Sequence, residues 1–339
     1  MKRSNAIYFF VIYFSITIIN FLHAEKPDAF SILKLASQDS AKPYFGKVIS
    51  KMKQGSTTIQ TKVFIKVKSP QKYKKDFFTN NGKLERTVFA DKENEWIYFP
   101  MKNMIWKGDV KKSQEKLISE DKEWELINNN YNLELKQGEK IAKRNTWVLN
   151  IIPKDKGKPY RTLWIDQDEN VILKNKEFYP DGLLAEESFF EEITFPELPE
   201  SIPIAFQIPT KAKIKEHGYN PDFMSLEKLK ESGIHYPYFP EHIPVGFVFE
   251  SADFFTLKGK EISHLRFTDG LNVISLFESA DPVSTKSKDF NWQFNELEST
   301  HIGFSKSGKV LHWKLKNRYL TLVGNLSLEL LQKISHSIK

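Results

Sequence analysis

The sequence predicts an α+β protein with two domains in which antiparallel sheets dominate. Three observations lead to this fold class. Apolar and polar residues alternate with a period of two in many short runs, and turn residues separate these runs. Helical spacing of apolar residues appears in only a few places. A proline-rich stretch at residues 195–209 interrupts the pattern and marks a domain boundary, because proline is excluded from central strands and helix interiors.

The first element is a helix over residues 28–40. Asp28 is a suitable N-cap, and Phe30, Leu33 and Ser37 follow at helical spacing. The period then changes to two between Ile59 and Val67, which predicts a strand with one apolar face.

More short strands follow, and their regular spacing predicts an antiparallel meander. They are expected at residues 73–78, 84–90, 95–99 and 104–106, then at 133–136, 146–152, 160–166, 171–179 and 188–195. A helix is expected between the two groups, over residues 111–128, with Leu117, Ile118 and Trp124 toward the core.

The second domain is smaller. Strands are expected at residues 247–251, 262–267, 272–278, 309–315 and 318–323, and a closing helix carries the stripe Leu326, Leu330, Leu331, Ile334 and Ile338. Asp269 and Gly270 predict a tight hairpin turn with Gly270 at positive φ. We therefore divide the chain into residues 1–24, 25–205, a proline-rich linker region 206–235, and 236–339.

The first 24 residues have the plan of a secretory signal peptide. Lys2 and Arg3 precede an apolar stretch, and Ala24 provides a small residue at the expected cleavage site, so the mature chain is expected to begin at Glu25. The alternative is an uncleaved membrane anchor, although the apolar stretch is at the short limit for a span. Export predicts a soluble protein of the periplasm.

Composition excludes some functions. The net charge of +7 is spread along the chain, whereas nucleic-acid binding requires a concentrated basic face, so no nucleic-acid partner is expected. There is no cysteine, so neither disulfides nor a lipid attached through cysteine is expected. Six lysines and no acid occupy residues 62–75. We interpret them as a solvated strand face, with contact to an anionic lipid or partner as the alternative.

No constellation of residues predicts catalysis, a metal site or a cofactor. Residues 303–309 have the glycine and lysine spacing of a phosphate-binding loop, but Val310 stands where magnesium requires Ser or Thr. The residues after Lys309 alternate like a strand, so Ser307 and Gly308 are interpreted as a hairpin turn. The eight histidines show no ligand spacing. A non-enzymatic binding protein is therefore expected.

Aromatic residues are abundant, with 27 Phe, 12 Tyr and 7 Trp. Core packing is one explanation. The other is a curved sheet whose two long helices leave part of its apolar face uncovered, forming a cleft for acyl chains. For this cleft we nominate Val63, Ile65, Phe77, Val88, Ile97, Trp106, Leu149 and Trp164.

Several motifs carry a family resemblance. Residues 67–75, 96–100 and 159–166 resemble strands of the lipoprotein carrier LolA. Residues 243–247, 264–271 and 274–277, with Val323, Gly324, Asn325 and Leu326, resemble the C-terminal domain of the MucB/RseB family, which regulates the sigma-E envelope stress response. The likeness covers nearly the whole mature chain.

The resemblance implies a fold and a role. The fold is an open antiparallel half-barrel with helices plugging its concave side, followed by a smaller α+β domain. The role is to bind the periplasmic segment of a transmembrane anti-sigma factor and to respond to lipid, lipoprotein or lipopolysaccharide signals. We expect the second domain to bind the protein partner and the first to bind acyl chains. A carrier of the LolA type is the alternative, an exported enzyme is a third, and a homo-oligomer is possible.

Overall fold

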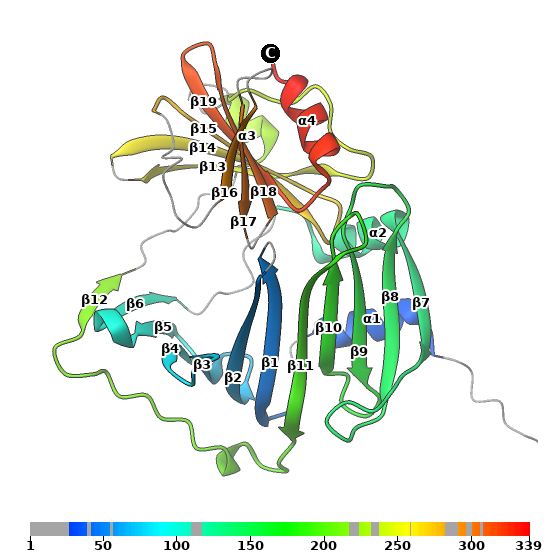
Figure 1. The fold of residues 1–339 in the computed structure, drawn as a ribbon, viewed down its shortest axis with the longest axis vertical. Coiled ribbons are helices and arrows are strands. Elements are labelled where there is room, and N and C mark those ends of the chain that lie inside the picture. Colours follow the sequence, from blue (N-terminus) through cyan, green and yellow to red (C-terminus); the bar gives the residue numbers. More distant parts are fainter. Residues whose placement is uncertain are drawn as a thin grey trace, which may run out of the picture.

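The computed structural model describes residues 27–38, 42–54, 57–109, 117–216, 224–231, 237–257, 259–281, 291–295, 300–305 and 308–339. These residues form two sheets and few helices, so the protein is mostly β structure (Figure 1). The predicted signal peptide and its cleavage site at Ala24 lie outside the described residues. In the described part of the chain, no helix is long and apolar enough to cross a membrane.

The larger sheet has twelve strands in the order β12-β6-β5-β4-β3-β2-β1-β11-β10-β9-β8-β7. Neighbouring strands are antiparallel, except that β12 runs parallel to β6. Because β12 and β7 occupy opposite ends, the sheet is open and forms no closed barrel. The strands are β1 (Tyr44–Gln54), β2 (Thr57–Ser69), β3 (Lys72–Thr79), β4 (Leu84–Asp91), β5 (Asn94–Phe99), β6 (Met104–Asp109), β7 (Tyr131–Gln137), β8 (Thr146–Pro153), β9 (Tyr160–Asp166), β10 (Ile172–Phe178), β11 (Leu184–Thr194) and β12 (Lys213–Glu216).

Strand β1 is central to this sheet, yet its sequence pattern does not predict it. Phe45, Lys47 and Ile49 lie on one face, whereas Val48 and Ser50 lie on the other, so each face mixes apolar and polar residues. A period of two is visible only when one face is apolar and the other polar. Strand β1 forms because its backbone pairs with β2 on one side and β11 on the other, and not because of a one-sided apolar pattern.

Two helices cover part of one face of the larger sheet, which we call the inner face. Helix α1 (Ala29–Ser37) begins after Asp28, whose carboxylate accepts the backbone N–H of Ser31 at 2.8 Å. This hydrogen bond lowers the pKa of Asp28. Helix α2 (Glu120–Asn130) is capped in the same way by Ser119. Both pack on a core formed by Ile32, Leu33, Ile127, Tyr131, Leu135, Leu149, Ile151, Leu163 and Ile165.

The predicted helix over residues 111–128 is wrong at its beginning. Residues 117–119 are not helical, and Leu117 is 45% exposed instead of facing the core. Residues 110–116 lie outside the described part. The physical reason is the capping chemistry, because Ser119 followed by Glu120, Asp121 and Glu123 is a strong helix start that the apolar spacing alone did not reveal.

The proline-rich segment packs on the opposite, outer face. The ring of Phe206 stacks on that of Phe89 with centroids 5.2 Å apart, and Ile202 is fully buried. The segment contains a short 3₁₀ helix, η2 (Pro199–Ser201). A second one, η1 (Pro100–Lys102), lies between β5 and β6. The segment then adds β12 to the edge of the larger sheet.

The smaller sheet has seven strands in the order β13-β14-β15-β19-β18-β17-β16. They are β13 (Val248–Leu257), β14 (Lys260–Thr268), β15 (Val273–Ser279), β16 (Asn291–Asn295), β17 (Thr300–Ser305), β18 (Gly308–Leu315) and β19 (Arg318–Gly324). Helices α3 (Leu226–Glu231) and α4 (Leu328–His336) pack on one face, against buried residues that include Leu265, Leu276, Leu311, Leu322 and Leu331. The sequence pattern missed β16, β17 and α3.

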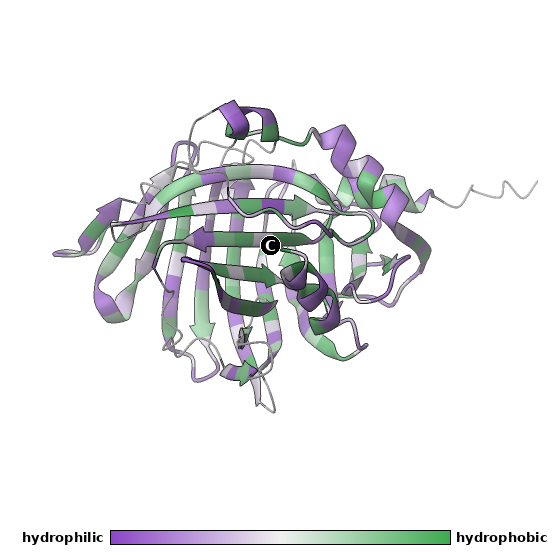
Figure 2. Cartoon of the chain, turned by 90° about the horizontal axis from the view of Figure 1, so that it is seen from above, coloured by the Kyte–Doolittle hydropathy of each residue, from purple (hydrophilic) through white to green (hydrophobic). Residues whose placement is uncertain are grey.

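The second domain sits across one end of the larger sheet (Figure 1). Seen from above, the strands of the smaller sheet run across those of the larger one, and apolar and polar residues alternate along both (Figure 2). This arrangement brings the β8–β9 loop of the first domain against α4, and α2 against the β14–β15 turn.

Candidate functional site

The β14–β15 turn is the centre of the contact between the domains. Gly270 lies in it with a φ of 97°, which favours glycine. A side chain there would meet the backbone O of Glu123 and Cγ1 of Ile127 at 3.0 and 2.9 Å, both in α2. The next residue, Leu271, packs against the core beneath α1 and α2. The turn predicted as a local feature is thus inserted into the first domain.

Asp269, in the same turn, is completely buried and surrounded by donors. The backbone N–H groups of Leu271 and Asn272 donate to Oδ1 at 3.2 and 2.8 Å. The Tyr131 hydroxyl donates to Oδ2 at 2.7 Å, and Lys158 Nζ lies 3.2 Å from the same oxygen. A buried carboxylate is stable only with such partners, so this residue ties the two domains together.

Lys158, from the loop between β8 and β9, supplies the opposite charge. Its side chain is 1% exposed. Besides Asp269, its Nζ donates to the carbonyl of Val245 at 3.0 Å and lies 5.2 Å from the ring centroid of Phe247. Among the described residues, its other contacts are with Asp155 and Tyr131 of the first domain. Lys158 therefore anchors the first domain in the second.

Two adjacent residues at the end of α2 complete this buried cluster, which we call the clamp. Asn130 Nδ2 donates to the carbonyls of Gly246 and Asp269 at 2.9 and 3.0 Å. Burial, reinforced by the carboxylate of Asp269, raises the pKa of Tyr131, so its hydroxyl stays protonated and donates. The clamp consists of Asn130, Tyr131, Lys158, Asp269 and Asn272.

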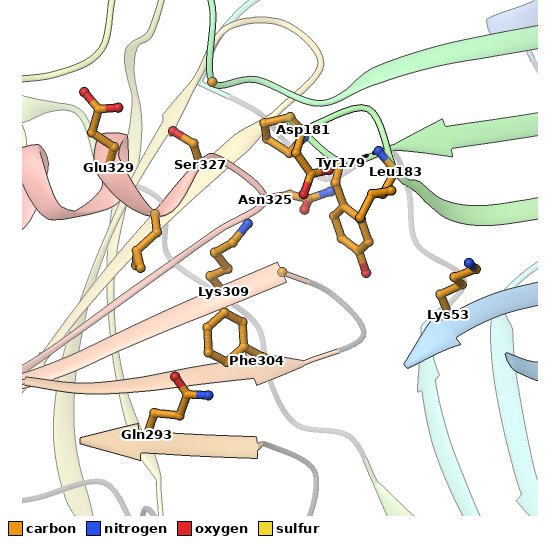
Figure 3. A pocket seen from close by; sticks show the side chains of 14 residues that line it. Lys53, Tyr179, Asp181, Leu183, Gln293, Phe304, Lys309, Asn325, Ser327 and Glu329 are labelled. Atoms are coloured by element: carbon orange, nitrogen blue, oxygen red, sulfur yellow. Dashed lines mark hydrogen bonds between the residues drawn. The ribbon is translucent and has the colours of Figure 1, made fainter. Parts of the chain in front are cut away.

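Beside the clamp lies an open cleft of about 830 Å³ between the domains (Figure 3). The β1–β2 and β10–β11 hairpins of the first domain form one wall. Strands β16, β17 and β18 and the start of α4 form the other. At its edge the two domains are joined directly, since Asn325 Nδ2 donates to Glu177 Oε1 at 2.7 Å. Its lining includes Lys53, Gly157, Tyr179, Asp181, Leu183, Gln293, Phe304, Lys309, Asn325, Ser327 and Glu329.

Lys309, the lysine of the segment 303–309 that resembles a phosphate-binding loop, points into this cleft (Figure 3). It belongs to β18, which pairs with β17 as an antiparallel strand, so the strand prediction for this region is confirmed. Ser307 lies outside the described residues. Partial burial lowers the pKa of Lys309, and the carboxylate of Asp181 opposes that shift. Across the cleft, burial and the charge of Asp181 raise the pKa of Tyr179.

A second cavity, of about 580 Å³, opens on the inner face of β1–β4. Met52, Ile59, Val63 and Phe77 give it an apolar wall, and Arg86 and Glu186 add charge. The nominated residues Ile65, Val88, Ile97 and Trp106 continue along the same face in one cross-strand row, with Lys75 between Ile65 and Val88. We call the cavity and this row the inner groove.

The structure separates two nominated residues from the inner groove. Leu149 faces the same way but is fully buried beneath α1 and α2. Trp164 is wrong as a lining residue, because it pairs with Lys174 and Val148 and therefore points to the outer face. There Lys174 Nζ lies 4.5 Å from its ring centroid. Alternation along one strand did not reveal which face each residue would occupy.

Sequence reasoning missed the clamp partners of Asp269 and the cleft residues Tyr179 and Lys309. Lys158 is one of three lysines in a polar loop, and nothing local distinguishes it from Lys154 or Lys156. Among the described residues, no three His, Asp or Glu side chains gather in a way that could hold a metal ion.

The family profile described as the MucB/RseB N-terminal domain matches residues 34–214. The chain belongs to the MucB/RseB family. The resemblance drawn from the sequence motifs is therefore confirmed. A search of curated proteins finds no match.

Solved structures share the fold over both domains of this MucB/RseB family member. A chain of the Pseudomonas aeruginosa MucA/MucB complex is 16% identical, with 92% of this chain and 99% of that chain covered and a TM-score of 0.57. A structure of MucB in complex with MucA(peri) gives 16% identity, coverage of 92% and 98%, and a TM-score of 0.56. At this identity the likeness shows the fold alone.

Proposed function

We propose that this protein is a periplasmic, non-enzymatic regulator that binds the periplasmic segment of a transmembrane anti-sigma factor. The observation that carries the proposal is the open cleft between two domains that the clamp holds in a fixed orientation. Membership of the MucB/RseB family supports it, and MucB structures of this fold contain MucA.

The cleft has the properties of a site for a polypeptide segment. Its volume of about 830 Å³ lies within the range of binding pockets. Phe304, Leu183 and Leu328 offer apolar contact, while Lys309, Lys53 and Asp181 offer charges of both signs. Since the second domain supplies β16, β17, β18 and α4, we place most of the partner contact there, as the sequence predicts. Tyr179 and Asp181 form the opposite wall.

The test is binding of the periplasmic segment of the anti-sigma factor, fluorescently labelled, to the full mature chain. Lys309→Glu places a negative charge in the wall and is expected to weaken binding about tenfold or more, because a charge reversed inside an interface is left unpaired. Lys136→Glu, on an exposed position of β7, is the control with the same change in charge. Equal binding by both variants contradicts the proposal.

We propose in addition that the inner groove takes acyl chains, with the open sheet acting as a half-barrel. Met52, Ile59, Val63 and Phe77 supply apolar surface that α1 and α2 leave uncovered. The groove and the cleft share two hairpins, since Met52 lines the groove while the next residue, Lys53, lines the cleft. A chain entering the groove can therefore displace a wall of the cleft, which couples lipid binding to partner release.

Uptake of a fluorescent fatty acid tests the groove. Trp106→Glu puts a charge on the inner-face row and is expected to reduce uptake, whereas capture of the partner in the absence of lipid is unchanged. Phe294→Glu, at a position 55% exposed in β16, is the matched control. A carrier of the LolA type is the alternative function. It is favoured if lipid binds but no anti-sigma segment does.

A further inference from the structure

The outer face of β1, β2 and β3 carries a cluster of lysines from all three strands. Register places their side chains on one surface, because Lys62 pairs with Ile49 and Phe78, and Lys66 pairs with Phe45 and Lys74. This face is opposite to the inner groove. We call the following set the outer lysine patch: Lys47 and Lys51 of β1, Lys62 and Lys66 of β2, and Lys74 of β3.

Exposed aromatic rings lie among these lysines. Phe64 is 43% exposed, pairs directly with Lys47, and lies between Lys62 and Lys66 along β2. Phe45, 38% exposed, pairs with Lys66. Phe64 is held edge-on against Phe78 with ring centroids 5.5 Å apart, so its position is fixed by packing. Lysines lie beside Phe64 along β2 and opposite it on β1, and Asp76 lies opposite it on β3. A large apolar side chain left exposed among charged groups indicates a binding surface.

Carboxylates neutralise only part of the patch. Lys74 pairs with Asp76 at 2.9 Å, and Lys47 pairs with Glu191. Lys66 donates to the carbonyl of Pro203 at 3.1 Å, which leaves its charge uncompensated. In the described part of the chain, neither Lys51 nor Lys62 has a carboxylate within ion-pair distance. Carboxylates of β11 also face the patch, since Glu187 pairs with Lys51 in register, and the hydrogen bond from Lys47 together with the charge of Lys62 lowers the pKa of Glu191. The positive excess of the face is therefore reduced on the side of β11.

We propose that the outer lysine patch docks the protein on the surface of an anionic phospholipid bilayer. The ammonium group of lysine is a compact point charge, which suits a diffuse layer of phosphates. A single phosphate bound through two parallel hydrogen bonds would favour arginine. No residue of the outer lysine patch lines the cleft or the cavity of the inner groove. The patch is a strand surface of charged side chains and exposed rings, which suits a broad layer of headgroups. Phe64 and Phe45 fit the headgroup boundary, where aromatic rings concentrate.

This docking goes beyond the proposed binding function and is compatible with it. The strands β1–β3 lie side by side near the middle of the larger sheet (Figure 1). Contact through their outer face leaves the inner groove, on the opposite face of the same strands, open. A protein held at the membrane in this way meets a membrane-anchored partner at high local concentration.

The experiment is flotation of the full mature chain with vesicles of phosphatidylethanolamine and phosphatidylglycerol, compared with vesicles of phosphatidylcholine. We expect binding to the anionic vesicles only, with a decrease as salt is raised. The double variant Lys62→Glu, Lys66→Glu is expected to lower the partition coefficient about tenfold or more. Phe64→Ser, which keeps every lysine, is expected to lower it about threefold.

The control double variant Lys136→Glu, Lys140→Glu changes the net charge equally at exposed positions outside the patch. It is expected to bind like the unaltered protein. The proposal is overturned if the control loses as much binding as the patch variant, or if neutral vesicles bind equally. It is also overturned if soluble polyglutamate binds the patch while anionic vesicles do not, which would identify an acidic protein as the occupant. Thermal unfolding of each variant verifies that it is folded.

Discussion

The two domains meet in two adjacent regions of opposite character. In the clamp, Asp269 is completely buried and every oxygen of its carboxylate has donors within 3.2 Å. In the cleft, about 830 Å³ between the same domains is left open, although polar groups of both domains face it. The difference shows how the domains can be fixed in orientation without filling the surface between them. The clamp sets the geometry, and the cleft remains available for binding.

The two regions use lysine in different ways. Lys158 in the clamp has a side chain 1% exposed and is satisfied by a carboxylate, a carbonyl and an aromatic ring. Lys309 in the cleft is only partly buried, and its one direct hydrogen bond among the described residues, at 2.9 Å, is to the carbonyl of Leu326. The first lysine is a structural part of the contact, whereas the second keeps capacity for a partner.

The largest expected effect is that of Lys158→Met. This change leaves Asp269 buried without its cation, and removing one member of a buried ion pair costs about 3–5 kcal/mol. We expect a loss of that order in the free energy of unfolding, measured by urea denaturation. The control is Lys260→Met, because Lys260 and Asp281 form an exposed pair with side chains 47% and 54% exposed. Its expected loss is below about 1 kcal/mol, and equal losses would show that the clamp is not a special contact.

Gly270→Val measures how tightly the inserted turn is docked. Both Gly270 and Gly82 have positive φ, at 97° and 74°. A side chain at Gly82 meets nothing within 4 Å, whereas one at Gly270 meets α2 at 2.9 Å. Gly82→Val is therefore expected to cost only backbone strain of about 1–2 kcal/mol. Gly270→Val is expected to cost at least about 1 kcal/mol more, because the turn must separate from α2.

Thermal or urea unfolding of the two glycine variants gives this comparison directly. If both lose the same stability, the turn is not pressed against α2, and the clamp would have to hold the domains without the apolar contact of Leu271.

The smallest expected effect on stability is that of Lys309→Met, within about 1 kcal/mol near neutral pH, since one hydrogen bond is lost and apolar length is kept. Its signature is pH dependence. Burial lowers the pKa of Lys309 from its ordinary value of 10.5, so near that pH the unfolded chain holds more protons than the folded one. The stability of the unaltered protein should therefore rise relative to Lys309→Met as pH increases toward 10.5. A constant difference across this window would contradict the burial of the ammonium group.

Features that depend on neighbouring residues of one strand or turn could be predicted from the sequence, whereas features that depend on pairing between distant segments could not. The strand over Ile59 to Val67 was predicted because its apolar residues share one face, and β1 was missed because its residues do not. The nominated groove residues of β2 to β6 share a face in the structure, since each follows the alternation of its own strand. Trp164 was misplaced because its face depends on the register of β9 with β8, which pairs it with Val148 and not with Leu149.

The sequence by itself determined the family, the antiparallel strands and the turn chemistry of Asp269 and Gly270, because motifs, alternation and turn preferences act over a few neighbouring residues. The tertiary structure alone decided what that turn does. Tyr131 and Asp269 are 138 residues apart, and their hydrogen bond exists only when both domains are folded and in contact. The cleft has the same origin, since Lys309 resembles part of a phosphate loop in the sequence and becomes a wall residue only when β18 meets the hairpins of the first domain.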